Sequence, residues 1–296
     1  MSSVCDKIRN DFKTNDDKRD EGLTTPEDII RYDNICYGTD ETWQIMDIYL
    51  PKNFADGRKL PVIVSVHGGA WVYGTKETYQ FYCMNLAQRG FAVVNFTYRL
   101  APEFKFPASA EDTNLVMKYI FDHAEEYGFD TSRIFAVGDS AGAHLLTIYT
   151  AMSTDPEYLA KIGVTLPEGF SFKAIALNCG KYSFLVDNKI FEEGDAAILY
   201  ELLPEHGTDK EMEVMNVIDF VNKDFPPVFI MTASDDFLKD QSVLLAGKLV
   251  ELKVPFTFKC YGAADHPLYH VFHCDMRSED ATKCNDDECK FFTEYM

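Results

Sequence analysis

The sequence predicts an α/β protein with a mostly parallel central sheet, helices on both faces of the sheet and a helical cap. Apolar strand-like runs alternate with helical segments at the spacing of βα units. Several of these runs are continuously apolar, which is typical of strands buried on both faces. Residues 181–225 interrupt this alternation, so we expect them to form the cap as an insertion. The 296 residues are expected to be a single domain, because α/β domains often exceed about 200 residues.

The chain is expected to begin with an N-terminal arm over residues 1–31, in which apolar residues recur at helical spacing. Within it, TTPEDI is typical of a helix start, with Thr25 as N-cap and Pro26 in the first turn. Residues 30–38 and 43–51 then alternate between apolar and polar side chains. We expect them to pair as an antiparallel start to the sheet.

The rest of the chain alternates between buried strands and helices, each ending in glycine or polar residues. The predicted strands, with their closing turns, are 60–69, 91–98, 133–142, 172–180, 226–236 and 255–262. The predicted helices are 78–90, 108–128, 143–152 and 241–253. In such a sheet ligands bind at the carboxyl ends of the strands, so the cap would cover the site.

The composition excludes some classes of partner. A net charge of −20 argues against nucleic acid and anionic membrane surfaces, which would repel the chain. No run approaches the roughly 18 apolar residues of a membrane helix. The first 22 residues are charged and contain no apolar signal segment, so we expect a cytoplasmic location. The expected partner is a small molecule, and a homodimer is left open.

Eight cysteines are scattered along the chain and are expected to be reduced and mostly buried. Cys284 and Cys289 have four residues between them, which is wider than the spacing of most zinc sites. Cys274 lies nearby, so a metal cluster at this end of the chain is an alternative. We expect no metal and no other cofactor.

A candidate nucleophile lies in GDSAG (138–142), a G-x-S-x-G motif between an apolar strand and a helix. In this context the glycines let strand and helix pass close together, and Ser140 is exposed at the tip of a sharp turn. The alternative is an ordinary turn between a strand and a helix.

HGGAW (67–71), which closes the first buried strand, is typical of an oxyanion loop. Acyl transfer develops a negatively charged oxygen that needs fixed N–H donors. We expect Gly69 and Ala70 to supply two of them, and Ala141, after the nucleophile, to supply the third. The alternative is a glycine-rich turn without function. The residues expected to support the site without reacting are His67, Gly68 and Asp139.

Six motifs together resemble a known family. They are HGGAW (67–71), YRLAPE (98–103), FPA (106–108), EDT (111–113), GDSAGAHL (138–145) and DFLKDQ (236–241). Their order resembles the α/β hydrolases that include hormone-sensitive-lipase-like carboxylesterases and bacterial acetyl, xylan and feruloyl esterases. The resemblance covers roughly residues 40–295 and implies the α/β-hydrolase fold. HGGAW departs from the commoner HGGG, although alanine still offers an N–H group.

The resemblance also guides the choice of the catalytic acid, which in this fold follows the serine along the chain and precedes the histidine. Asp235, Asp236 and Asp240 are available after the strand 226–236. The family places its acid directly before x-L, which selects Asp236 and leaves Asp235 as the fallback. Asp240 fits better as the N-cap of the helix 241–253.

Three histidines in HPLYHVFHC compete for the role of the base. On a helix, His266, His270 and His273 would share one face, as a metal site needs, but the proline after His266 disfavours a helix there. His266 follows Asp236 by 30 residues, close to the usual family gap, and His270 follows it by 34. His270 begins HVF, which matches the family's H-x-F. The longer gap to Asp236 is explained by a four-residue insertion, which loops accept readily. We assign the base to His270, keep His266 as the alternative, and expect His273 to be structural or solvent-facing.

These residues predict a serine esterase acting on small acyl groups such as acetate, with Ser140 attacking, His270 moving the proton and Asp236 orienting the imidazole. An arylformamidase remains an alternative, because HGGAW resembles the HGGxW found in such enzymes. A catalytically silent, small-molecule-binding member of the fold is a second alternative. The preference for short acyl chains rests on two observations. GAHL (142–145) resembles the sugar-ester and aryl-formamide branches of the family more than the lipase branch, and the cap carries bulky residues such as Phe184, Phe191 and Tyr200.

Overall fold

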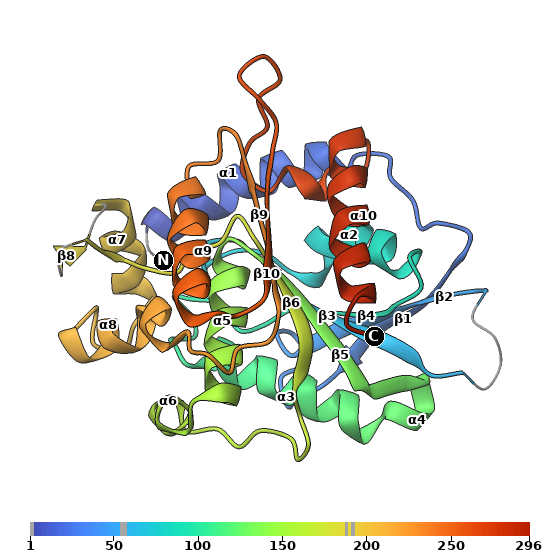
Figure 1. The fold of residues 1–296 in the computed structure, drawn as a ribbon, viewed down its shortest axis with the longest axis horizontal. Helices are drawn as coiled ribbons and strands as arrows, with labels where there is room; N and C mark the ends of the chain where they lie inside the picture. The colour runs from blue at the N-terminus through green and yellow to red at the C-terminus, as the bar shows by residue number, and fades with distance from the viewer. Residues whose placement is uncertain (1–2, 54–57, 187–188, 191–192) are drawn as a thin grey trace.

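The structure is a computed structural model that describes residues 3–53, 58–186, 189–190 and 193–296. Within them, eight strands form one sheet in the order β1-β2-β4-β3-β5-β6-β9-β10 (Figure 1). The strands are β1 (Ile29–Cys36), β2 (Ile45–Pro51), β3 (Leu60–Val66), β4 (Ala92–Phe96), β5 (Phe129–Asp139), β6 (Phe172–Asn178), β9 (Val228–Ala233) and β10 (Phe256–Tyr261). β2 pairs antiparallel with β1 and β4, whereas the other neighbours are parallel. The predicted sheet with its antiparallel start is confirmed.

Helices cover both faces of this sheet (Figure 1). One face carries α2 (Lys76–Ala87) and α10 (Glu279–Thr293), and the other carries α3 (Ala108–Asp122), α4 (Ala124–Tyr127), α5 (Ala141–Thr154), α6 (Pro156–Ile162) and α9 (Lys239–Leu252). The alternation of side chains along each strand explains the division. In β3, Ile63 packs in the layer of α2 and α10, whereas Val62 and Val64 pack in the opposite layer. Both faces are buried, which is why the strand sequences are continuously apolar.

The N-terminal arm forms a helix, α1 (Ser3–Asp20), as its apolar spacing predicts. Arg9 fixes this helix to the body of the protein. Its Nε donates to Val72 O at 2.8 Å, and its guanidinium pairs with Glu103 at 2.6 Å. The arm is therefore docked against the loop that follows β3.

The helix start expected at Thr25 and Pro26 is wrong, because this segment is a turn that leads into β1. The Ile29 N–H donates to Pro26 O at 3.2 Å, and the Lys52 N–H donates to Asp28 O at 2.7 Å. Pairing with the end of β2 already occupies this backbone, so tertiary contacts override the local helix signal.

The segment 181–225 lies beside α5 and α9 rather than continuing the sheet (Figure 1). Its described elements are β7 (Leu185–Val186), β8 (Lys189–Ile190), α7 (Glu193–Leu202), α8 (Asp209–Met215) and the 3-10 turn η1 (Val217–Phe220). The sequence predicts short helices here but not the antiparallel pair of β7 and β8, each of which is two residues long. Helix α7 contacts α1, so the cap segment and the N-terminal helix meet.

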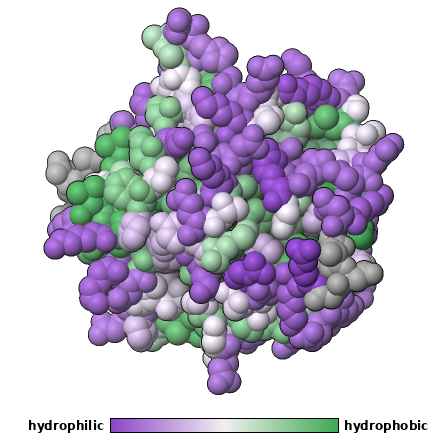
Figure 2. All heavy atoms as spheres, turned by 45° about the vertical axis from the view of Figure 1, so that its right-hand side comes forward, coloured by the Kyte–Doolittle hydropathy of each residue, from purple (hydrophilic) through white to green (hydrophobic). Residues whose placement is uncertain are grey.

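The face of the molecule in Figure 2 is mainly hydrophilic, with apolar areas between the polar side chains. This face is as expected for a chain with 48 acidic and 28 basic residues. Among the described residues, no helix combines the length and the apolar character that a bilayer crossing requires.

Candidate active site

Ser140 lies on a sharp turn between β5 and α5. Its φ and ψ are 52° and −119°, a strained combination for a residue with a side chain. The turn needs glycine, because a Cβ on Gly142 would lie 2.0 Å from Val66 O, and one on Gly138 would lie 2.7 Å from Gly142 O. The Ser140 N–H donates to Asn178 O at 2.9 Å, which ties the turn to β6. The motif therefore has the predicted strand–turn–helix context.

The loop after β3 holds three consecutive residues at positive φ: 118° at Gly69, 52° at Ala70 and 60° at Trp71. Gly69 O accepts hydrogen bonds from the N–H groups three and four residues later, at 3.1 and 2.9 Å. Within the described residues, the N–H groups of Gly69, Ala70 and Ala141 have no hydrogen-bond partner, and all three residues line one cavity with Ser140. These free donors are what an oxyanion hole requires.

His67 is fully buried behind this loop. Its ring stacks on Tyr98 at a centroid distance of 4.0 Å, and its Nδ1 lies 2.7 Å from Gly68 O. The Tyr98 hydroxyl donates to His67 O at 2.9 Å. Burial lowers the pKa of His67 to about 4, so the imidazole is neutral. These contacts fit the supporting role expected for His67.

Tyr79, which the sequence analysis does not single out, joins the oxyanion loop to the nucleophile turn. Its hydroxyl donates to Asp139 Oδ2 at 2.6 Å and accepts from the Gly68 N–H at 3.0 Å. Asp139 is buried, and this burial raises its pKa to about 6. In the sequence, Tyr79 occupies an ordinary apolar position of the helix α2, so no local pattern distinguishes it as part of the site.

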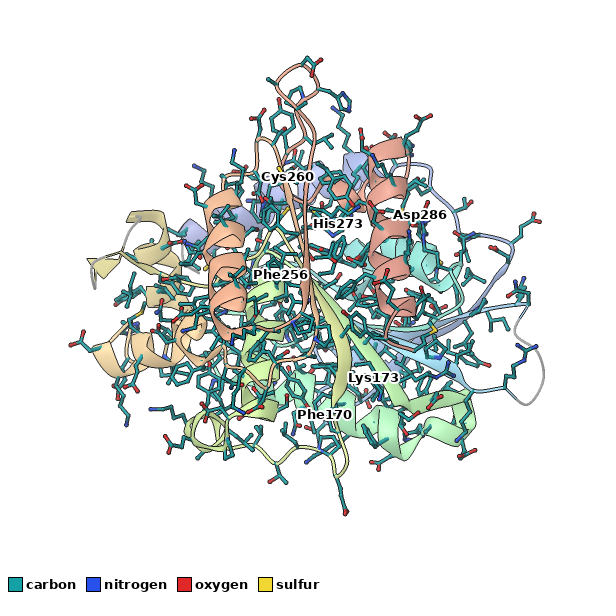
Figure 3. All side chains as sticks on the ribbon, viewed as in Figure 1. Phe170, Lys173, Phe256, Cys260, His273 and Asp286 are labelled. Carbon is teal, nitrogen blue, oxygen red and sulfur yellow. The ribbon has the colours of Figure 1, made fainter. Side chains whose placement is uncertain are left out.

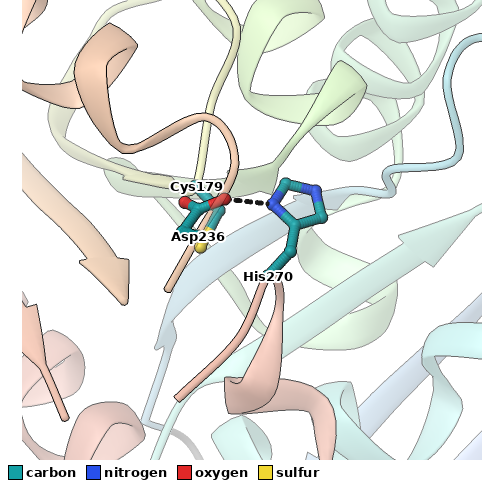
Figure 4. Close-up of side chains that lie close together, drawn as sticks. All are labelled: Cys179, Asp236 and His270. Carbon is teal, nitrogen blue, oxygen red and sulfur yellow. Dashed lines mark hydrogen bonds and ion pairs between the residues drawn. The ribbon is translucent and has the colours of Figure 1, made fainter. Parts of the chain in front are cut away.

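Asp236 and His270 form a hydrogen-bonded pair, with His270 Nδ1 2.7 Å from Asp236 Oδ1 (Figure 4). The buried Asp236 also accepts the Leu238 N–H at 2.9 Å and the Thr232 hydroxyl at 2.8 Å. Burial alone would raise the pKa of Asp236, but the hydrogen bond and the charge of His270 outweigh it and leave the pKa lowered. The structure thus brings together the predicted acid and the predicted base.

The other two acids lie elsewhere. Asp235 is exposed, and its backbone N–H donates to Leu268 O at 2.9 Å. The expectation that Asp240 caps the following helix is wrong, because α9 begins at Lys239 and Leu238 occupies the N-cap position. The Lys239 N–H donates back to the Asp236 carbonyl at 3.2 Å, so the turn after the strand already starts the helix.

The three histidines of HPLYHVFHC are separated in space. His266 is exposed in a tight turn, and its Nε2 lies 2.7 Å from Asp280 Oδ2. His273 is fully buried beside α10 and contacts the Tyr82 ring edge-on at 5.0 Å (Figure 3). It is therefore structural rather than solvent-facing. Only residues 272–274 are helical here, as the single turn η2, so the three rings do not share a helix face.

A cavity of about 500 Å³ joins these parts, since Ser140, His270 and the oxyanion loop all line it. Its wall also contains residues that the sequence analysis does not assign to the site. They are Ile8, Phe12 and Arg19 of α1, and Lys181, Asp195 and Ile198 of the cap segment. The sequence indicates an amphipathic N-terminal helix, but only the folded chain shows that this helix walls the site.

The bulky residues named for the cap have different environments. Phe184 is buried and packs on Trp71, which lines the cavity, at a centroid distance of 5.5 Å. Tyr200 is 52% exposed and stacks on His206, so it does not restrict the cavity. Phe191 lies outside the described residues.

Cys274, Cys284 and Cys289 are free, buried thiols. They do not assemble into a group of metal ligands in the part of the chain that the structure describes. A different group appears there, formed by Cys179, Asp236 and His270.

The chain is similar to known esterases. The BD-FAE family model matches residues 46–249. The versiconal hemiacetal acetate esterase of Dothistroma septosporum is 27% identical, and the match covers 72% of this chain and 67% of that protein. The acetyl esterase of Salmonella schwarzengrund is 26% identical over 78% and 71% of the two chains. The first three curated relatives are covered over 50 to 67% of their length.

Among solved structures, esterase B from Lactobacillus rhamnosis superposes with a TM-score of 0.88 at 23% identity, over 99% of this chain and 95% of that one. This likeness confirms the predicted fold. The esterases among the relatives confirm the predicted resemblance to carboxylesterases. The chain belongs to the BD-FAE family and has the α/β-hydrolase fold.

Proposed function

We propose that the protein is a serine carboxylesterase that removes short acyl groups, acetyl above all, through Ser140, His270 and Asp236. The observation that carries this proposal is the pair between His270 Nδ1 and Asp236 Oδ1, on the cavity that also contains Ser140. A serine becomes a strong nucleophile only when a base that is itself oriented by a third group takes its proton.

The pair fixes the tautomer of the base. With the proton on Nδ1 donated to Asp236, the lone pair of His270 is on Nε2, which can take the Ser140 hydroxyl proton. Ser140 Oγ then attacks the ester carbonyl and forms a tetrahedral intermediate. The free N–H groups of Gly69, Ala70 and Ala141 stabilise its oxyanion.

The imidazolium next protonates the leaving alcohol, and the intermediate collapses to an acyl-enzyme on Ser140. A water molecule, deprotonated by His270, attacks this ester in the same oxyanion hole and releases the carboxylic acid. Every proton step passes through His270, while Asp236 stays ionised. This role agrees with its lowered pKa.

The preference for short acyl chains is supported by the apolar side chains near the oxyanion loop. Trp71 is the last residue of that loop, and the rings of Phe184 and His144 pack on its ring at centroid distances of 5.5 and 5.3 Å. These buried rings hold Trp71 in place as a bulky wall of the cavity, which favours a small acyl group beside it. The acetyl-ester relatives from Dothistroma septosporum and Salmonella schwarzengrund point the same way.

The proposal is tested by reaction with a fluorophosphonate probe and by steady-state kinetics. We expect the probe to label wild-type protein at Ser140 and p-nitrophenyl acetate to be hydrolysed. Wild-type protein that folds but is not labelled would contradict the proposal and indicate a silent member of the fold. Labelling combined with a higher kcat/KM for N-formylkynurenine than for the acetate ester would instead indicate an arylformamidase.

A further inference from the structure

Cys179 lies directly beside the Asp236–His270 pair (Figure 4). Its sulfur, a carboxylate oxygen of Asp236 and a ring nitrogen of His270 all lie within 4.8 Å of one another. Cys179 follows the end of β6 at a φ of 48°, and its N–H donates to Met231 O at 2.7 Å. The backbone thus fixes the thiol at this position, and the esterase mechanism makes no use of it.

Sulfur, imidazole nitrogen and carboxylate oxygen are the donors that zinc prefers. Tetrahedral zinc with bonds of about 2.0 to 2.3 Å holds such donors roughly 3.5 Å apart. His270 Nδ1 and Asp236 Oδ1 are 2.7 Å apart, so an ion between them would replace their hydrogen bond with a small outward shift. The sulfur, within 4.8 Å of both, would need to move inward by only about 1 Å. The charges also match. A Cys179 thiolate and the Asp236 carboxylate together neutralise a dication, and buried ions need this compensation.

We propose that Cys179, Asp236 and His270 form a binding site for a thiophilic divalent cation such as Zn²⁺, and that binding there switches the esterase off. The part about inhibition rests on the proposed function, because it assumes that His270 is the base. The part about binding rests only on the three side chains.

Inhibition follows from the tautomer of His270. In the resting pair, Nδ1 carries the proton and Nε2 has the free lone pair. A cation bound at Nδ1 displaces that proton, which moves through water to Nε2, so the imidazole stays neutral but can no longer accept a proton from Ser140. The Cys179 thiol releases its proton to solvent on becoming a thiolate. No oxidation takes place.

The route for the ion passes His270, whose side chain is 18% exposed, while the side chain of Asp236 is not exposed. The ring must swing aside before the ion reaches the two buried donors. Inhibition should therefore develop slowly after zinc is added, and a chelator should reverse it.

The test measures p-nitrophenyl acetate hydrolysis in buffered free Zn²⁺, with each variant compared to its own zinc-free rate. Wild type should lose at least tenfold in activity and regain it with EDTA. Removing an outer-shell partner of a metal costs roughly 10- to 100-fold in affinity, so Cys179→Ala, which removes a ligand itself, should need at least that much more zinc. Cys289→Ala, a buried free thiol on α10, is the matched control and should respond like wild type. Should Cys179→Ala fail to fold, Cys179→Ser replaces it, because it keeps the size of the side chain and loses the thiolate.

Equal zinc sensitivity in wild type and in the Cys179 variant would overturn the proposal and place the ion elsewhere. A second readout does not depend on activity. Co²⁺ added to Ser140→Ala should give a thiolate-to-cobalt absorption band in the near ultraviolet, and Cys179→Ala should lack it. If the band appears but zinc does not inhibit, the metal site stands and the assignment of His270 as the base fails. If the band is absent, the site itself is refuted.

Discussion

The side-chain amide of Asn178 donates a 2.7 Å hydrogen bond to Glu288 Oε2 where α10 packs on the sheet. The backbone carbonyl of Asn178 accepts a hydrogen bond from the Ser140 N–H at 2.9 Å. The other carboxylate oxygen of Glu288 accepts from the Tyr82 hydroxyl at 2.9 Å. A fully buried acid is thus connected to the nucleophile turn through a single residue, Asn178.

Glu288 should make the folded protein less stable as the pH rises. Burial raises its pKa from 4.5 to about 7, against the opposing effect of its two hydrogen bonds. Below about pH 4.5 the acid is protonated in both states and contributes nothing. Between pH 4.5 and 7 the unfolded chain loses the proton and the folded chain keeps it, so stability falls with rising pH and levels off above 7. Urea unfolding at both ends of this range should show that Glu288→Gln abolishes this part of the slope. Glu294→Gln, an exposed acid just after the same helix, should leave it in place.

Ser140→Ala should remove activity while the protein stays folded. The loss should be of order 10^4-fold or more, because the nucleophile and its base act as a unit. Initial rates on p-nitrophenyl acetate measure the loss, and circular dichroism checks the fold. Activity within about tenfold of wild type would disprove the assignment of the nucleophile.

His270→Ala should fall to the same residual rate as Ser140→Ala, because the serine then has no base. His266→Ala should keep most of the activity, since His266 is exposed and paired with Asp280. The His273→Asn variant should keep esterase activity but fold less stably, because His273 is buried against Tyr82. The opposite result for His266 and His270 would favour the alternative base.

The kcat/KM of the wild type should be highest for acetate and butyrate esters and much lower for decanoate esters. Trp71 lines the cavity and Phe184 packs on its ring from outside the lining, so Phe184→Ala should let Trp71 move back and raise kcat/KM for longer esters relative to acetate. Tyr200→Ala serves as the control, because Tyr200 is exposed outside the cavity and should not alter the preference. A higher kcat/KM of the wild type for decanoate than for acetate would refute the short-chain assignment.

EDTA should not lower activity. The proposed mechanism uses only side chains and backbone N–H groups, and a metal at His270 would inhibit rather than assist. Rates measured before and after chelation test this expectation. Loss of activity that zinc restores would show that the catalytic mechanism is wrong.

The nucleophile turn and the oxyanion loop could be predicted from the sequence because each depends on a short local motif. GDSAG and HGGAW each contain, within five residues, the glycines that their backbone conformation needs. Gly142, for example, packs so closely on Val66 O at the end of β3 that no side chain fits there. Asp236 and His270 needed the family resemblance in addition, because 34 residues separate them. No local pattern favours His270 over His266 on physical grounds alone.

Other features depend on contacts between distant segments. Nothing near Cys179 in the sequence indicates that its thiol lies beside Asp236, because β6 and β9 become neighbours only in the sheet. Helix α10 does have a signal that the sequence analysis missed. Ser278 is its N-cap, and Ala281, Cys284 and Phe292 recur at helical spacing behind a run of charged residues.

The contacts of α1 join residues that are far apart along the chain. Besides the bonds made by Arg9, the backbone carbonyls of Arg19 and Glu21, at the end of this helix, accept hydrogen bonds from the guanidinium of Arg277. Arg277 follows His270 by seven residues, so the helix that lines the cavity is tied to the segment that holds the proposed base. We therefore expect the cavity wall and the proposed base to reach their final positions in the same late step of folding.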